Sequence, residues 1–233
     1  MSNVLRFLAK HLARNKGLLF FLIGMLMFRS AAADWNVVPT GSMQPTIRMG
    51  DRILVDRAAY DIRLPLTHVS LLHLGDPARG DIVVLDSRAA GERLVKRVVG
   101  IPGDVVAMRD NQLIINGTPA TYTAGSVTGI RDDRQDPARY ALENVDGVRH
   151  AIRLSIHHPS PVSSFGPVRV PPGQYLLLGD NRDNSEDSRY LGFFPRSEIL
   201  GRSRYVVASL DPGHDYLPRW NRFGASLDRD AMK

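Results

Sequence analysis

One lysine carries the strongest chemical signal in this chain. Lysine and arginine together number 30, but only four of these residues are lysines, and the other three lie near the chain ends. Lys96 stands inside the apolar stretch of residues 94–99, LVKRVV. A buried ammonium can lose its proton near neutral pH, whereas a guanidinium cannot. The ordinary alternative is a surface lysine whose stem covers apolar surface, but the wider context favours a neutral lysine that acts as a general base.

Ser42 is the matching candidate nucleophile. It lies in residues 38–47, VPTGSMQPTI. Gly41 frees the backbone just before the serine, and Pro39 and Pro45 restrict the flanks, so the hydroxyl can be held at a fixed and exposed angle. Taken alone, this segment is more simply read as an ordinary Pro/Gly/Ser turn.

A third stretch, residues 179–192, packs four acids, two arginines and two serines into one loop, GDNRDNSEDSRYLG. Oxygen ligands at close spacing would suit calcium. However, the sixth residue from Asp180 is Ser185 rather than glycine, and arginines interleave the acids. We therefore interpret the loop as a self-compensating Asp/Arg network and expect no metal and no cofactor.

Other catalytic classes are disfavoured. The chain has no cysteine, which excludes a thiolate metal site and a cysteine nucleophile. Of its seven histidines, His157 and His158 are adjacent, and His68 and His73 have no obvious serine or acid partner, so a Ser-His-Asp triad is not expected. The net charge of +6 comes from scattered arginines without a basic run, and we expect no nucleic-acid partner.

The N-terminal region predicts a membrane segment. Residues 1–16 carry four basic residues and no acid, residues 17–28 are unbroken apolar sequence, and the first carboxylate is Asp34. The positive-inside bias keeps the N-terminus in the cytoplasm and translocates the rest. A cleavable signal peptide with a small-x-small site at residues 30–33 explains the same segment equally well.

Past residue 34 the apolar runs are short, β-branched and bounded by Gly, Pro, Asp or Asn, which predicts strands rather than helices. An all-β protein is expected, a mostly antiparallel barrel or sandwich preceded by one N-terminal transmembrane helix. The strand candidates are residues 53–55, 81–85, 94–99, 105–108, 112–115, 175–178 and 205–208.

The domain organisation follows from composition. Residues 111–170 are rich in Gly, Asp, Arg, Ser and Pro, and include the charged run 131–134, so they predict an inserted, looser β-rich subdomain. We expect the following division: a cytoplasmic tail (1–16), an anchor (17–33), a discontinuous catalytic core (34–110 and 171–212), the insertion (111–170) and a C-terminal tail (213–233).

Together these motifs resemble bacterial signal peptidase I, a family of membrane-anchored peptidases with a serine-lysine dyad. Four boxes match in order and spacing, at residues 39–46, 80–84, 96–104 and 179–192. The resemblance spans roughly residues 17 to 210 apart from the insertion. It also favours a retained single-pass anchor, with the catalytic domain on the outer side of the bacterial inner membrane.

The resemblance implies a role for each matching residue. Ser42 would be the nucleophile and Lys96 the general base, with the Ser42 N–H and the Thr40 hydroxyl as the oxyanion hole. The family commonly has serine where this chain has Thr40, which keeps the hydroxyl but adds a methyl group. Ser185 would orient the lysine ammonium. The salt-bridged support of the last box would be Asp180, Asp187 and Arg189.

The implied substrates are the signal peptides of exported preproteins, cut after small-x-small sites. Shallow apolar pockets would reject large side chains by steric exclusion. Alignment of the serine box assigns them Val38, Met43 and Ile47, with Val95 beside the lysine, and the alternative is that these are ordinary core residues. Trp220 and Phe223 are candidates for contact with membrane lipid. Two alternatives remain, a dedicated maturation peptidase for a pilin or conjugation subunit and a catalytically silent periplasmic scaffold.

Overall fold

The computed structural model describes residues 15–17, 20–21, 24–25, 33–64, 67, 69–125 and 136–227. Most of the expected cytoplasmic tail (1–16) and anchor (17–33) lies outside these residues, as does the charged run 131–134. Within the described part of the chain, no helix has both the length and the apolar character needed to span a bilayer.

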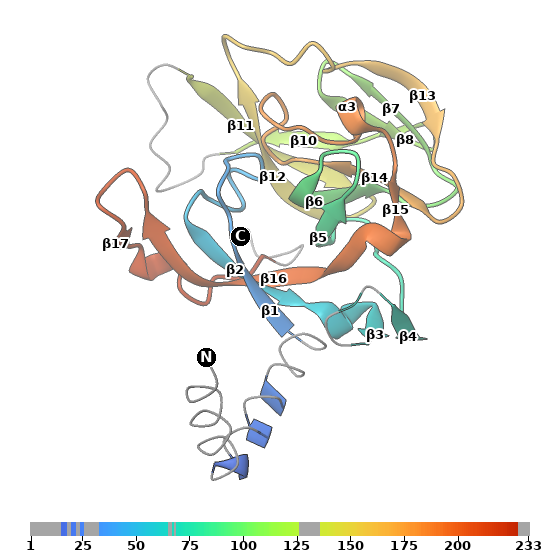
Figure 1. Cartoon of the computed structure of the whole chain (residues 1–233). Helices are drawn as coiled ribbons and strands as arrows, with labels where there is room; N and C mark the ends of the chain where they lie inside the picture. The colour runs from blue at the N-terminus through green and yellow to red at the C-terminus, as the bar shows by residue number, and fades with distance from the viewer. Residues whose placement is uncertain are drawn as a thin grey trace.

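An eight-stranded antiparallel sheet forms the centre of the molecule (Figure 1). Its path runs β1-β2-β16-β5-β6-β14-β15, and β17 pairs with β16 beside that path. The strands are β1 (Ala33–Val37), β2 (Asp51–Asp56), β5 (Ile82–Ser87), β6 (Glu92–Gly100), β14 (Gln174–Leu178), β15 (Phe194–Pro195), β16 (Ile199–Asp211) and β17 (Leu217–Pro218).

Three smaller sheets complete the fold, in the orders β13-β7-β8-β9, β10-β11-β12 and β3-β4. In Figure 1 the first two gather at the end of the molecule opposite the β3–β4 hairpin. Their strands are β3 (Asp61–Arg63), β4 (Ser70–His73), β7 (Val105–Arg109), β8 (Gln112–Ile115), β9 (Thr118–Pro119), β10 (Thr121–Ala124), β11 (Ala138–Val145), β12 (Val148–Ser155) and β13 (Phe165–Arg169).

The predicted all-β, mostly antiparallel architecture is confirmed. Each of the seven predicted strand segments falls within an observed strand or overlaps one. After residue 33 the described helices are single turns of three or four residues, namely η1 (Arg57–Ala59), α3 (Ser188–Leu191), η2 (Arg196–Glu198) and η3 (Trp220–Arg222).

Strand β6 crosses the middle of the core and contributes to all three of its apolar clusters. Val95 packs against the cluster that holds Val38, Met43 and Ile47. The other two clusters contain Leu94 with Val98 and, separately, Val99. Consecutive side chains of a strand point to opposite faces, so a residue in the centre of β6 is enclosed whichever way it points.

The described part of the expected insertion (111–170) is more regular than its composition predicts. Strands β11 and β12 are eight residues each and turn at Asp146-Gly147, where both residues have positive φ (50° and 82°). Such Asp-Gly pairs favour a two-residue hairpin turn. The strands were not predicted because charged residues occupy many of their positions, and several of those residues are buried in ion pairs. The proposed boundary at residue 111 falls in the β7–β8 turn, so one sheet extends across it.

Candidate active site

A tight turn presents the Ser42 hydroxyl. Val38 accepts a hydrogen bond from Gly50 and donates one to Asp51, which ties the start of the segment to β2. The turn then closes through bonds from Gln44 N to the Gly41 carbonyl (3.0 Å) and from Ile47 N to the Met43 carbonyl (2.9 Å). Met43 and Ile47, which follow Ser42 in the chain, are fully buried, whereas Ser42 itself is half-buried. Apolar anchors therefore hold a hydroxyl that stays partly exposed.

Lys96 meets this hydroxyl from β6. Its Nζ lies 3.0 Å from Ser42 Oγ, although 54 residues separate the two in sequence. The side chain is only 3% exposed and stands opposite the fully buried Val83 of β5. Burial lowers the pKa of the Lys96 ammonium, and the more distant charges of Asp187, Glu92 and Glu186 oppose this shift only in part.

The loop of residues 179–192 holds the other side of the serine turn. The Asn181 backbone N–H donates to the Ser42 carbonyl (3.0 Å), and its side-chain amide donates to the Gly41 carbonyl (3.1 Å). A Cβ added at Gly179 would collide with the Ser42 carbonyl oxygen and with the Ser185 side chain. This close approach requires glycine at position 179.

Ser185 lies against the same turn. It is buried, and its Oγ has no hydrogen-bond partner among the described residues, Lys96 included. A buried hydroxyl without a partner costs free energy unless a group that enters the site supplies one. The orienting role assigned to Ser185 by resemblance therefore stays a prediction.

Two buried ion pairs support this loop. Arg97, the neighbour of Lys96, donates from Nε and Nη2 to the two carboxylate oxygens of Asp180, at 2.8 and 2.7 Å. Burial alone would raise the pKa of Asp180, but Arg97, His150 and Thr46 hold it below its usual range. Asp187 accepts two bonds from Arg189 at 2.8 Å and one from the Gly179 N–H at 3.0 Å.

A third ion pair reaches the loop from the insertion, and sequence reasoning missed it. Glu143 of β11 is fully buried and accepts both terminal nitrogens of Arg182, while Arg182 Nε donates to the Gly179 carbonyl (3.2 Å). His150 of β12 lies 3.1 Å from Glu143, and burial and Arg97 lower its pKa. The Asp146-Gly147 turn signal would have identified this hairpin, but not its ion pairs.

Backbone pairing joins the insertion to the same loop. Arg153 of β12 donates its N–H to the Asp180 carbonyl (2.9 Å) and accepts from Arg182 N (3.0 Å), which forms a parallel bridge with Asn181. The β11–β12 hairpin thus directly supports the segment that contacts Ser42.

Three of the four expected pocket residues are buried, and the fourth is partly exposed. Val38, Met43 and Ile47 are buried members of one core cluster, whereas Val95 is partly exposed at its edge.

The Thr40 hydroxyl is exposed and lies 3.5 Å from Ser42 Oγ. Within the described part of the chain, no group of His, Cys, Asp or Glu side chains could hold a metal ion.

This arrangement can perform nucleophilic acyl transfer. A neutral amine at 3.0 Å can accept the hydroxyl proton, because the two atoms are at hydrogen-bond distance and burial lowers the pKa of Lys96, which favours its neutral form. The nearby Thr40 hydroxyl can donate to a developing oxyanion.

Comparisons with known proteins identify a peptidase family. The family described as signal peptidase, peptidase S26, matches residues 12–208. The chain is 36% identical over 213 residues to a signal peptidase I of Pseudomonas fluorescens, covering 86% of this chain and 74% of that protein. It is 35% identical over 215 residues to a signal peptidase I of Pseudomonas aeruginosa, with the same coverage of both chains.

Among solved structures, a signal peptidase I of Enterococcus faecalis is 28% identical, with a TM-score of 0.33, and the match covers 55% of this chain and 97% of that one. The sequence matches alone span most of the chain at more than 30% identity. This protein belongs to the signal peptidase family, peptidase S26.

Proposed function

We propose that this protein is a serine endopeptidase that removes N-terminal signal peptides from exported preproteins, cutting after small-x-small sites. The observation that carries the mechanism is the 3.0 Å approach of Lys96 Nζ to Ser42 Oγ, combined with the burial of that amine. The names of the relatives support the substrate class. They do not favour a dedicated maturation peptidase or a silent scaffold.

The reaction proceeds through an acyl-enzyme. Neutral Lys96 accepts the Ser42 proton as Ser42 Oγ attacks the carbonyl carbon of the scissile bond, and the resulting ammonium returns this proton to the departing amine. Water then attacks the ester with Lys96 again as the base, which releases the signal peptide and regenerates Ser42. The Ser42 N–H and the Thr40 hydroxyl stabilise the oxyanion in both steps.

Supporting residues hold this geometry. Ser185 orients the ammonium form of Lys96, which would give its buried hydroxyl a partner. The ion pairs of Asp180 and of Asp187 with Arg189 keep the loop against Ser42. Val38, Met43, Ile47 and Val95 shape shallow pockets for small side chains, with Val95 already partly exposed at the edge of the core cluster.

The location follows the topology expected from the N-terminus. Residues 17–33 anchor the chain once in the bacterial inner membrane, with residues 1–16 in the cytoplasm and the catalytic domain on the periplasmic side. Support comes from the basic residues before the apolar run and the carboxylate after it. Exported preproteins emerge on that side, so enzyme and substrate meet at the membrane surface.

Cleavage of a defined preprotein tests this function. The detergent-solubilised enzyme should cut a preprotein with an Ala-x-Ala site after the second alanine, and Ser42→Ala should abolish the cut, as read by mass spectrometry of the products. Wild-type enzyme that leaves this preprotein intact would contradict the proposal.

Substitution of Thr40 tests the oxyanion role. Thr40→Val removes the hydroxyl at nearly constant shape and should lower kcat by about 100-fold, the usual cost of one oxyanion donor. Thr40→Ser keeps the hydroxyl and should retain activity. Equal activity in the valine and serine variants would remove Thr40 from the mechanism.

A further inference from the structure

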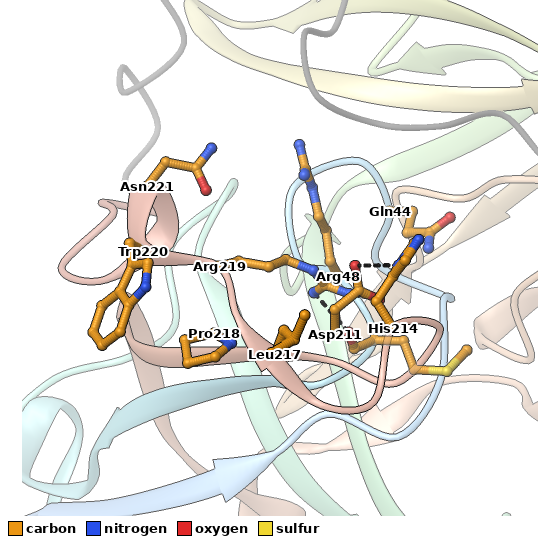
Figure 2. A pocket seen from close by; sticks show the side chains of 10 residues that line it. Gln44, Arg48, Asp211, His214, Leu217, Pro218, Arg219, Trp220 and Asn221 are labelled. Atoms are coloured by element: carbon orange, nitrogen blue, oxygen red, sulfur yellow. Dashed lines mark hydrogen bonds and ion pairs between the residues drawn. The ribbon is translucent and has the colours of Figure 1, made fainter.

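A cavity of about 700 Å³ lies beside the serine turn, between residues 44–49 and residues 211–221 (Figure 2). One arginine of its lining, Arg219, is held firmly by its neighbours. Its guanidinium pairs with Asp211 at 3.0 Å and donates to the Met49 carbonyl at 2.9 Å. A cation bound in this way by its own protein has little left to offer a ligand.

Another cavity, of about 480 Å³, lies on the β3–β4 hairpin and contains an arginine in different surroundings. Gly173, just before β14, and residues 195–197, from β15 to η2, form the wall that faces the hairpin. Across the hairpin, Asp61 pairs with His73, and Arg63 pairs with Ser70. The hairpin contributes these four residues, Asp61, Arg63, Ser70 and His73, to the lining.

Asp61 is the buried carboxylate of this cavity. It accepts hydrogen bonds from Arg63 Nη2 (3.0 Å), Arg196 Nη1 (2.9 Å) and Ser70 Oγ (3.2 Å). Burial would raise the pKa of Asp61, but the hydrogen bonds from Arg196 and Arg63 lower it to about 2, so the carboxylate is charged at neutral pH. Two guanidinium groups thus share one buried carboxylate, because Asp76, which also binds Arg196, is 62% exposed. An additional anion would be stabilised here.

The two arginines of the cavity differ in how their N–H groups are used. Arg196 also donates to Asp76 (3.0 Å) and to the Gly75 carbonyl (2.9 Å). Arg63 is only 5% exposed, and its Nη2 also donates to the Ile199 carbonyl, whereas its Nε and Nη1 have no hydrogen-bond partner among the described residues. Buried donors without an acceptor cost free energy. The fold therefore leaves the acceptor for Arg63 to be supplied by a ligand.

The arrangement of polar groups favours a phosphate group as this ligand. Arg63 on β3, His73 on β4 and Ser197 on η2 line the cavity from three different elements. A tetrahedral phosphate presents its oxygens in several directions, whereas a carboxylate presents both in one plane. The fork of a guanidinium also matches the spacing of phosphate oxygens.

The opposite face of the hairpin is apolar. Ile62 alternates with Asp61 and Arg63 along β3, so its side chain points away from them. It pairs with Leu72 of β4, and the two side chains are 42% and 54% exposed. A ligand with a phosphate group and an apolar tail would match both faces of the hairpin.

We propose that the cavity on the β3–β4 hairpin binds a phosphate group, with Arg63 as the cation that recognises it. The phosphate belongs either to the headgroup of a lipid or to a soluble phosphate ester, and the apolar face of the hairpin makes the lipid the tighter ligand. This inference goes beyond the proposed function and does not rest on it.

Titration calorimetry of the full chain, solubilised in an uncharged maltoside detergent, tests the site. The probes are dihexanoyl phosphatidylglycerol, glycerol phosphate, glycerate and dihexanoylglycerol. We expect saturable binding of the two phosphate compounds, with the lipid bound more tightly. Glycerate, which carries a carboxylate, and dihexanoylglycerol, which carries no charge, should show no saturable binding. Because binding is measured directly, the result does not depend on peptidase activity.

Variants locate the binding. Arg63→Gln should raise the Kd of both phosphate compounds by about tenfold or more, the effect of losing charge-assisted hydrogen bonds. Arg63→Lys, which keeps the charge but not the fork, should raise it less. Ser197→Ala, at an exposed position, should raise it by about two- to fivefold. Arg139→Gln, an exposed arginine of β11 outside the cavity lining, is the control and should bind as the wild type does.

Each other outcome has a definite meaning. No saturable binding of either phosphate compound by the wild type, or equal binding of glycerate, overturns the inference. Unchanged binding in a folded Arg63→Gln variant does the same, and if melting temperatures show that this variant does not fold, unchanged binding in Ser197→Ala decides against the site. Saturable binding of the lipid alone supports a headgroup site, whereas equal affinity for the two phosphate compounds supports a site for soluble phosphate esters.

Discussion

Lys96 and Arg97 are consecutive residues of β6, both almost fully buried, and their surroundings are opposite. Arg97 is 1% exposed and binds the carboxylate of Asp180 through two nitrogens. Lys96 is 3% exposed, and its nearest polar partner is the neutral hydroxyl of Ser42. Burial with a carboxylate keeps a cation charged, whereas burial without one favours the neutral form. One strand thus carries a structural cation and a potential base side by side.

Arginine at position 96 should have the largest effect. Lys96→Arg places a permanently charged guanidinium beside Ser42 and removes the base, so kcat/KM for an Ala-x-Ala preprotein should fall by about three orders of magnitude or more. Rates from single-turnover cleavage measure it. The reciprocal change, Arg97→Lys, should retain the base and lose mainly stability. A Lys96→Arg enzyme with full activity would show that Lys96 is not the base.

Removal of the carboxylate beside Arg97 tests whether the buried Arg97–Asp180 pair stabilises the fold. Asp180→Asn leaves a buried guanidinium without its counter-charge, and loss of one partner of a buried pair costs about 3–5 kcal/mol of unfolding free energy. Chemical denaturation of the variant measures this. A variant as stable as the wild type would show that the Arg97–Asp180 pair does not support the loop.

The pH dependence of stability tests whether Lys96 is neutral in the folded protein. Because its folded-state pKa is lowered, the unfolded chain binds a proton that the folded chain lacks, so stability rises with pH from the folded-state pKa up to the ordinary value near 10.5. Lys96→Met lacks this rise. Its stability advantage over wild type should be largest at neutral pH and shrink as pH increases, and an advantage independent of pH would contradict a lowered pKa.

The smallest effect is expected at an exposed pair of the same strand. Arg93 donates to Asp86 at 2.7 Å, but both side chains are more than a third exposed. Solvent screens such pairs, so Arg93→Gln should change unfolding free energy by at most about 1 kcal/mol. A loss as large as that of Asp180→Asn would show that burial does not separate the two classes of pair.

The local pattern of residues was sufficient to predict much of this protein. Short β-branched runs between Gly, Pro and Asp predicted the strands of the main sheet. The sequence motifs, taken together, singled out Ser42 and Lys96. The insertion was harder to predict, because Glu143 and His150 occupy buried positions that a polarity pattern assigns to solvent. Their burial depends on Arg182 and Asp180, residues whose proximity cannot be inferred from spacing along the chain.

The sequence by itself determined the family, the β-rich class and which side chains could react, since motifs and periodicity are properties of neighbouring residues. The tertiary structure alone decided that Lys96 Nζ reaches Ser42 Oγ across 54 residues and that a carboxylate pairs with Arg97 but not with Lys96. It also decided that the β11–β12 hairpin supports the loop of residues 179–192. The same packing encloses Arg63 in the cavity on the β3–β4 hairpin. The physical reason is that burial and charge pairing depend on contacts between distant segments, and these effects determine pKa and ligand preference.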